Sequence, residues 1–263
     1  MDHDADRLWR ASMPEAYDHR LAAAVFRPFA VDLAERATRL RPRRVLEIAA
    51  GTGVLTRELA PHATVVATDL SDAMVEYGAR QVPGAQWRQA DARRLPFADG
   101  QFDLVACQFG VMFLPGKPAA YAEMRRVLAP GGHLLFNTWG EVGEHGFARP
   151  LANALADVFP ENPPQFVTAI PHGYHDPGAV RADLRAGGLG AVSAETVTLE
   201  GRADSAAAIA TGFCTGTPLR AEIEARAEPA ESVAAVAEHM TAELGEGPVT
   251  ARMTAHVFQV SRS

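Results

Sequence analysis

Cysteine is nearly absent from the chain, with only two among 263 residues. Cys107 and Cys214 are too few for a disulfide framework, and neither has the spacing of a zinc ligand. We interpret both as buried thiols rather than as catalytic ones. The chain also begins with acidic residues that no apolar export segment follows. These features predict a cytoplasmic protein, since reduced cysteines are typical of a reducing compartment.

Long apolar runs and an excess of positive charge are missing as well. No uninterrupted apolar stretch approaches the roughly 20 residues that a membrane-spanning helix needs. The net charge of -7 repels nucleic-acid phosphates and anionic lipid surfaces unless basic residues are concentrated somewhere. The most basic segments, residues 39–44 and 93–94, flank expected strands, so we interpret them as solvated connections. The sequence therefore predicts no membrane partner and no nucleic-acid partner.

Neither a repeat at a fixed period nor a low-complexity tract interrupts the chain, and 48% of its residues are hydrophobic, enough for a substantial core. Between residues 44 and 138, short apolar runs alternate with helical patterns. The strands expected there are residues 44–49, 64–68, 86–90, 102–107 and 133–138. Such alternation predicts βαβ units and a mostly parallel sheet with both faces covered. Two further strands are expected at residues 194–199 and 250–260, with about fifty residues of helical character between them.

A glycine-rich turn, Gly51-Thr-Gly53, joins the first expected strand to the helix that follows it. Glycines at such a turn let a ligand approach the backbone, and the helix amides face that ligand. Asp69 ends the second strand, where a carboxylate can accept hydrogen bonds from both hydroxyls of a ribose. The structural alternatives are a tight turn without a ligand and, for Asp69, a helix cap beside Ser71.

Nicotinamide dinucleotides are the competing ligand for such a turn. Their fingerprint has a third glycine three positions after Gly53, and this chain has Thr56 there. The turn therefore fits a ligand without phosphates better.

Four segments in the same order, residues 45–53, 67–69, 89–97 and 125–132, resemble those of class I S-adenosylmethionine-dependent methyltransferases. The most similar group contains the ubiquinone/menaquinone C-methyltransferases and many bacterial small-molecule enzymes. The resemblance covers about residues 40–140 and is generic beyond them. It implies a Rossmann-like α/β fold with a seven-stranded, mostly parallel sheet and an antiparallel last strand. It also implies an enzyme that transfers a methyl group from S-adenosylmethionine to O, N or C of a small-molecule metabolite, releasing S-adenosylhomocysteine.

The resemblance implies cofactor contacts for individual residues. Those expected around the methionine part are Glu47, Ala49, Gly51, Gly53 and Gln108. Asp69 would hold the ribose, and those expected at adenine are Leu70, Met74, Asp91 and Ala92. Tyr17 would close over the cofactor as part of a lid. Ala49 is a departure, because it stands where the family has the first glycine of its motif and leaves the backbone less room.

The acceptor should lie beyond the carboxyl ends of the strands. The candidates for its apolar wall are Phe109, Met112, Phe113, Trp139, Tyr174 and Phe213, with ordinary core positions as the alternative. His172 and His175 are the candidate catalytic bases, because a histidine pKa of about 6.5 suits proton removal near neutral pH. A base is needed only if the acceptor must lose a proton. No set of carboxylates or histidines has a convincing ligand spacing, so no metal is expected.

We expect one domain made of five parts: an N-terminal helical lid at residues 1–40, kinked at Pro28, a cofactor-binding core at 41–140, substrate-cap segments at 141–175 and 203–245, and the last strand at 250–262. A non-catalytic sensor or scaffold that binds the same cofactor is the alternative to an enzyme. The identity of the acceptor, the methylated atom and the oligomeric state, with a homodimer among the alternatives, stay open.

Overall fold

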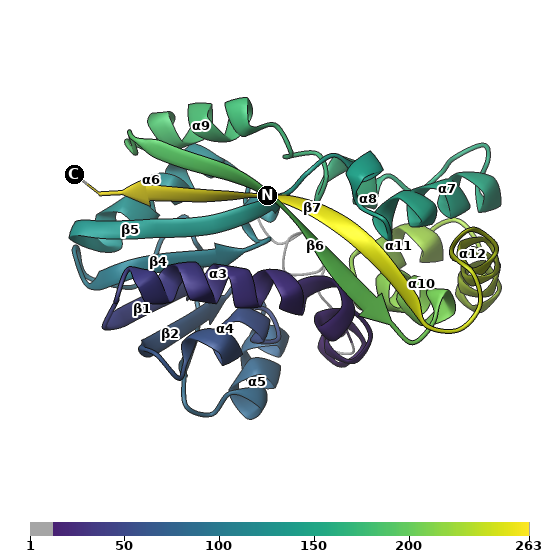
Figure 1. Cartoon of the computed structure of the whole chain (residues 1–263), viewed down its shortest axis with the longest axis horizontal. Coiled ribbons are helices and arrows are strands. Elements are labelled where there is room, and N and C mark those ends of the chain that lie inside the picture. The colour runs from purple at the N-terminus through teal and green to yellow at the C-terminus, as the bar shows by residue number, and fades with distance from the viewer. Residues whose placement is uncertain (1–12, 263) are drawn as a thin grey trace. The chain divides into compact units, whose positions relative to one another are not determined.

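The computed structural model describes residues 13–262 (Figure 1). The first twelve residues of the expected lid lie outside this range. Two compact units are present: a helical unit of residues 13–28, 140–173 and 198–254, and a sheet unit of residues 29–139, 174–197 and 255–262. Two of the boundaries between them fall inside the strands β6 (Val192–Ala203) and β7 (Val249–Ser261), so both strands carry residues of both units.

Seven strands form a single sheet in the order β3-β2-β1-β4-β5-β7-β6. The bounds of the first five are Arg44–Ile48 for β1, Thr64–Asp69 for β2, Gln86–Gln89 for β3, Phe102–Gln108 for β4 and Leu128–Trp139 for β5. The pairs β1–β2, β2–β3, β1–β4 and β4–β5 are parallel, and β5 pairs with β7 in the antiparallel sense. The expected mostly parallel, seven-stranded sheet with an antiparallel last strand is confirmed.

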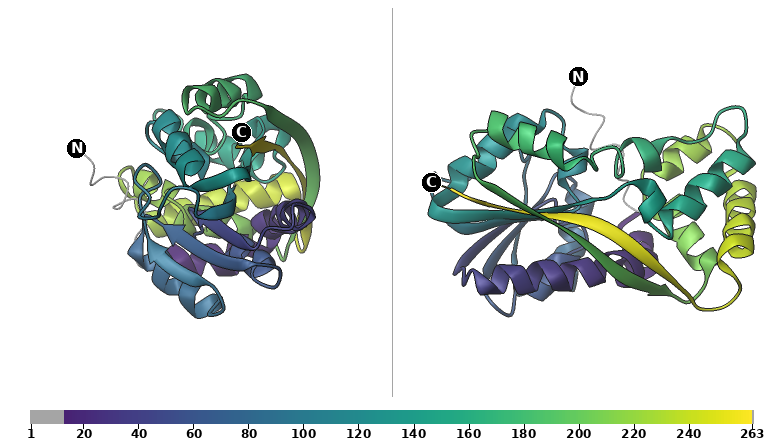
Figure 2. Two further views of the ribbon diagram at one scale, coloured as in Figure 1. Left: turned by 90° about the vertical axis from the view of Figure 1, so that its left-hand side faces the viewer. Right: turned by 45° about the horizontal axis from the view of Figure 1, so that its top comes forward.

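Helices cover both faces of the sheet within the sheet unit. Figures 1 and 2 show α3 (Arg27–Arg39) on one side of the sheet and α9 (Pro177–Ala186) on the other. The core on the α9 side also contains Tyr121 and Met124 of α6 (Lys117–Val127), packed with strand residues such as Val105. Two shorter helices, α4 (Val54–Leu59) and α5 (Asp72–Gln81), connect the first three strands. Coverage on both faces explains why the central strands read as continuous apolar runs.

The helical unit contains α2 (Met13–Tyr17), a π-helix η1 (Asp18–Phe26), the short 3-10 helix η3 (Val142–Glu144), α7 (Ala148–Val158), α8 (Phe166–Ala169), α10 (Ala206–Gly216), α11 (Leu219–Glu224) and α12 (Pro229–Leu244). Glycine permits close packing in this unit, since a Cβ on Gly201 would lie 2.0 Å from the Ala24 carbonyl oxygen. The helix type changes directly before Pro28, where a kink is expected. Within residues 13–262, no helix combines the length and the apolar character that a membrane span requires.

Candidate functional site

The strand order reverses direction between β1 and β4, which are neighbours although β2 and β3 intervene in the sequence. Ligands of open α/β sheets bind beyond the carboxyl ends of the strands at such a switch point. Glu47 and Ala49 lie at that end of β1, Asp69 ends β2, and Gln108 ends β4. Adjacent strands are about 4.8 Å apart, so these residues gather at one edge of the sheet.

The turn after β1 is held in left-handed backbone conformations. The φ angles of Ala49, Gly51 and Gly53 are 53°, 55° and 87°. Glycine adopts such angles without strain, whereas alanine does so at a cost of about 1–2 kcal/mol. A Cβ on Gly110 would lie only 2.6 Å from the Ala49 Cβ, so the absence of a side chain at Gly110 makes room for the Ala49 methyl group. The chain thus accommodates the alanine that replaces the family's first glycine.

We expect Gly110→Ala to destabilise the protein by about 1–3 kcal/mol, the usual range for an overpacked core. The new methyl group would meet both the Ala49 Cβ and, at 2.7 Å, the Cys107 Sγ. Thermal unfolding checks the loss, and the double variant Ala49→Gly/Gly110→Ala should recover part of it. Equal stability of the two variants would show that Ala49 and Gly110 do not share this space.

Asp69 fixes the glycine turn through its carboxylate. One oxygen, Oδ2, accepts a hydrogen bond from the Gly51 amide at 2.9 Å, and the other, Oδ1, accepts one from the Ser71 amide at 2.9 Å. The N-cap of α5 is instead Ser71, whose hydroxyl accepts from the Met74 amide. Each carboxylate oxygen has more than one lone-pair direction, so Asp69 retains capacity to accept from a ribose while its orientation is fixed.

Glu47 is a buried carboxyl group beside the same turn, with 1% of its surface exposed. Its Oε2 accepts a hydrogen bond from the Thr56 hydroxyl at 2.6 Å. Burial, with a smaller effect of the Asp69 charge, raises the pKa of Glu47 to about 8, although the Thr56 hydrogen bond acts the other way. Thr56, in the position of the third dinucleotide glycine, therefore serves to orient Glu47.

The raised pKa of Glu47 predicts a pH dependence of stability. Between the unfolded pKa of 4.5 and the folded pKa of about 8, the folded chain keeps a proton that the unfolded chain loses. Folding stability from this group therefore decreases as pH rises, by up to about 1.4 kcal/mol per pH unit. Glu47→Gln does not titrate, so its stability relative to the native chain should increase from about pH 5 to about pH 8. Urea unfolding across this range checks it, and a constant difference would contradict the assignment.

The residues expected at adenine follow β2 and β3. Leu70 is one of two large apolar residues exposed in the described chain, at 38%, whereas Met74 and Ala92 are buried. The Asp91 carboxylate accepts hydrogen bonds from the guanidinium of Arg93 at 2.8–3.1 Å, which holds the pKa of Asp91 below its usual range. Leu70 directly follows Asp69, so the flat face of an adenine ring could cover its exposed side chain.

Aromatic rings gather at the carboxyl ends of β4 and β5. The rings of Phe109 and Trp139 are stacked, 3.6 Å apart and 8° from parallel, and Phe29 meets both edge-on. Phe109 has a φ of 50°, and its amide donates to the Asn137 side-chain oxygen at 2.9 Å. Met112 is buried in the short 3-10 helix η2 (Val111–Phe113) that follows, and Phe113 is half-buried there. Asn137 is not among the candidates proposed from the sequence, although a polar residue inside the apolar run 133–138 indicates a buried polar group.

The remaining candidates are divided between the two units. In the helical unit, Tyr17 stacks on Phe26, Phe213 is half-buried, and His172 is buried with its Nδ1 2.8 Å from the Gly140 carbonyl oxygen. In the sheet unit, the Tyr174 hydroxyl donates to Asp183 at 2.8 Å, and the Lys117 ammonium lies 4.6 Å from the centre of the Tyr174 ring. His175 also belongs to the sheet unit and is partly exposed. The two histidines, three positions apart in the sequence, thus belong to different units.

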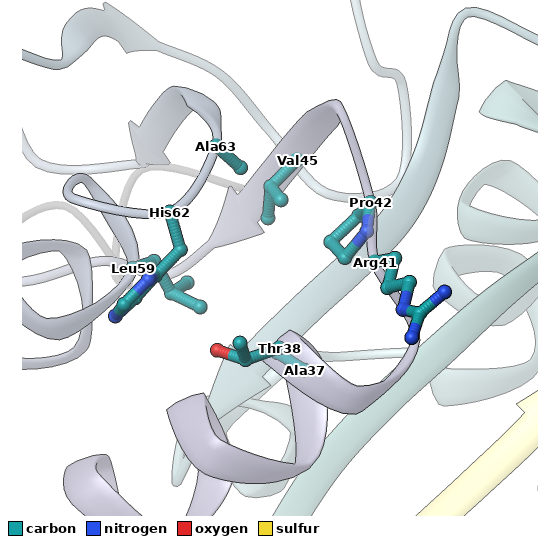
Figure 3. A pocket seen from close by; sticks show the side chains of 8 residues that line it. All are labelled: Ala37, Thr38, Arg41, Pro42, Val45, Leu59, His62 and Ala63. Carbon is teal, nitrogen blue, oxygen red and sulfur yellow. The ribbon is translucent and has the colours of Figure 1, made fainter.

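A small pocket lies at the opposite edge of the sheet unit, beside the start of β1 (Figure 3). Its lining residues are Ala37, Thr38, Arg41, Pro42, Val45, Leu59, His62 and Ala63. Its cavity of about 30 Å³ has room for about one water molecule. It is therefore too small for a nucleoside and lies away from the carboxyl ends of the strands. Among residues 13–262, no three side chains of His, Cys, Asp or Glu are grouped closely enough to hold a metal ion.

Residues 46–136 match the methyltransferase domain family. The chain is 40% identical over 131 residues to the ubiquinone/menaquinone biosynthesis C-methyltransferase of Ectopseudomonas mendocina, covering 46% of this chain and 49% of that protein. It is 45% identical over 131 residues to the demethylmenaquinone methyltransferase of Beutenbergia cavernae, covering 49% of this chain and 46% of that protein. The chain thus spans about half the length of the curated relatives it matches. The resemblance expected from the four motifs is confirmed over this segment.

Solved structures share the fold at low sequence identity. The YcgJ protein of a Bacillus species aligns with a TM-score of 0.59 and 19% identity, covering 89% of this chain and 98% of that one. The phosphoethanolamine N-methyltransferase 2 of Haemonchus contortus aligns with a TM-score of 0.63 and 14% identity, covering 98% of this chain and 60% of that one. At these identities the alignments support the Rossmann-like fold alone.

Proposed function

We propose that this chain, whose residues 46–136 belong to the methyltransferase domain family, is an enzyme that transfers a methyl group from S-adenosylmethionine to O, N or C of a small molecule. One observation carries the proposal: the Asp69 carboxylate fixes the amide of Gly51 in a left-handed glycine turn at the switch point of the sheet. That arrangement brings an acceptor for ribose hydroxyls beside the glycine turn. The family match covers both residues.

The residues present fit this cofactor in charge and polarity. Leu70 offers an exposed apolar surface next to Asp69, which suits adenine beside ribose. Glu47 is buried and oriented by Thr56, so a cationic group placed beside it would favour its ionised form. When bound, S-adenosylmethionine supplies a methyl group already activated on a positively charged sulfur. The protein then has to align the acceptor and exclude water.

Beyond the aromatic residues at the carboxyl ends of β4 and β5, acceptor binding is assigned in this proposal chiefly to segments 141–175 and 203–245, which lie outside the family match. Its support is that the match ends at residue 136, so residues specific to this chain's acceptor are expected beyond it. Tyr17 remains a proposed cofactor contact, Tyr174 and Phe213 remain proposed acceptor contacts, and His172 and His175 remain proposed bases. A cytoplasmic location is part of the proposal, supported by Cys107 and Cys214 being free and buried thiols.

Isothermal calorimetry with S-adenosylhomocysteine and NADH tests the cofactor assignment. We expect the chain to bind S-adenosylhomocysteine and not NADH, because Thr56 is hydrogen-bonded to Glu47 where a dinucleotide fold needs a glycine for close helix packing. Tighter binding of NADH would overturn the proposal. A non-catalytic sensor would bind S-adenosylhomocysteine equally well, so methyl transfer must be measured separately.

A further inference from the structure

Asn137 is a polar residue in the fully buried part of β5, with 0% of its surface exposed. It pairs in register with Gln108 of β4 and with Val257 of β7. Side chains alternate along a strand, so Asn137 shares a face of the sheet with Trp139, and Phe136 and Thr138 point to the other face. Asn137 therefore lies one strand away from Gln108, at the edge of the sheet where the cofactor is proposed to bind.

The side-chain oxygen of Asn137 has a defined partner. It accepts the hydrogen bond of the Phe109 amide at 2.9 Å, and Phe109 has a φ of 50°. A left-handed conformation is strained for a residue with a side chain, so this hydrogen bond offsets part of that strain. The contact also orients the carboxamide, because the oxygen faces Phe109 and the nitrogen must face elsewhere.

The side-chain nitrogen of Asn137 is buried and has no hydrogen-bond partner among residues 13–262. An unsatisfied buried donor is destabilising, and leucine would fill the same volume without that cost. Buried polar groups of native proteins are nearly always paired, so this nitrogen calls for an explanation, which a molecule bound against the neighbouring rings would supply.

Stacked aromatic rings are carried by residues that neighbour Asn137. Phe109, whose amide Asn137 holds, stacks on Trp139, which lies two residues further along β5. The Phe29 ring packs edge-on against both rings, with centroid distances of 5.3 Å to Phe109 and 5.0 Å to Trp139. A donor beside an aromatic surface is suited to a flat molecule that carries an oxygen at its rim.

We propose that Asn137 is an acceptor-binding residue, whose side-chain nitrogen donates a hydrogen bond to a carbonyl or hydroxyl oxygen of a flat, apolar methyl acceptor lying against Phe109 and Trp139. The inference rests on the proposed methyl-transfer function. Because Asn137 is fully buried, the acceptor reaches it when the Phe109–Trp139 stack opens, a side-chain rearrangement of the kind that is common on binding.

Three variants separate the donor role from a structural one. Asn137→Leu preserves volume and removes both the donor and the acceptor. Asn137→Asp keeps an oxygen for the Phe109 amide in either protonation state, but it can donate only while protonated, and burial raises the pKa of such a carboxyl group. Thr138→Val is the matched control. Thr138 is the next residue of β5, is equally buried, and its hydroxyl also has no hydrogen-bond partner among residues 13–262. Its side chain points to the other face of the sheet.

The probes are 2-acetylnaphthalene and 2-ethylnaphthalene, which differ mainly in one carbonyl oxygen. With saturating S-adenosylhomocysteine, we expect the native chain and Thr138→Val to bind the acetyl probe several-fold to about tenfold more tightly than the ethyl probe. Asn137→Leu should lose this preference. Asn137→Asp should show it at acidic pH and lose it as pH rises, which a residue that only holds Phe109 would not do.

Calorimetry measures the affinities, and thermal unfolding establishes that each variant is folded. Equal affinities of the native chain for the two probes, binding of neither probe, or a preference that survives in Asn137→Leu would overturn the inference while leaving the proposed function intact. Failure of the native chain to bind S-adenosylhomocysteine would contradict the proposed function itself, and the inference with it.

Discussion

Asp69→Ala is expected to weaken the affinity for S-adenosylhomocysteine about ten- to a hundredfold. Hydrogen bonds to a charged group contribute roughly 1.5–3 kcal/mol, which corresponds to that range of dissociation constants. The substitution also removes the acceptor of the Gly51 and Ser71 amides, so the glycine turn loses its fixed position. Calorimetry with the native chain and the variant checks the result.

Two controls separate ribose binding from a structural role of Asp69. Asp72→Ala removes an exposed carboxylate from the first turn of α5, so it should leave affinity unchanged. Asp69→Asn keeps one side-chain oxygen and should lie between the native chain and Asp69→Ala in affinity. Normal binding of S-adenosylhomocysteine by Asp69→Ala would mean that the Asp69 carboxylate of the native chain only connects the Gly51 and Ser71 amides.

His172→Asn is expected to lower the rate of methyl transfer about a hundredfold for an acceptor that must lose a proton, since that is the usual contribution of a general base. The Gly140 carbonyl oxygen can only accept, so the contact at 2.8 Å requires a hydrogen on Nδ1 of His172. The neutral ring then has its lone pair on Nε2, the form that a base needs. Asparagine preserves a donor near the Nδ1 position and removes Nε2.

The measurement compares turnover with cofactor affinity in the same variants. His172→Asn should bind S-adenosylhomocysteine as tightly as the native chain does, and His175→Gln serves as the comparison for the second proposed base. Normal turnover of both variants would mean that the acceptor is an amine or an already ionised oxygen. His172 would then be a structural residue of the helical unit.

The sheet could be predicted from the sequence because its strands are short apolar runs separated by helical periods. All seven expected strands are present, and α10, α11 and α12 occupy the segment of helical character expected between the last two. The division of the chain at residues 197–198 and 254–255 could not be predicted, because β6 and β7 continue through both boundaries without a change in pattern. The length of β6 was also underestimated, since half-buried alternation is a weaker signal than a continuous apolar run.

At the site, sequence spacing predicted which residues end the strands but not how they bond. Asp69 ends its strand as expected, since a strand end is readable from a break in apolar pattern, and Gln108, expected directly after strand 102–107, is the last residue of β4. The contact of Thr56 with Glu47, the space that Gly110 leaves for Ala49 and the unpartnered nitrogen of Asn137 depend on packing across strands. Such contacts join residues far apart in the chain, so no local pattern reports them.

The most direct test of methyl transfer is incubation with S-adenosylmethionine carrying a deuterated methyl group and a panel of small phenols, quinols, amines and carboxylic acids, followed by mass spectrometry. The proposed function predicts that one panel compound gains a single labelled methyl group while an equal amount of S-adenosylhomocysteine appears. Asp69→Ala should abolish most of this signal at a limiting cofactor concentration. Tight binding of S-adenosylhomocysteine without a labelled product from any compound would contradict the enzyme and support a non-catalytic sensor.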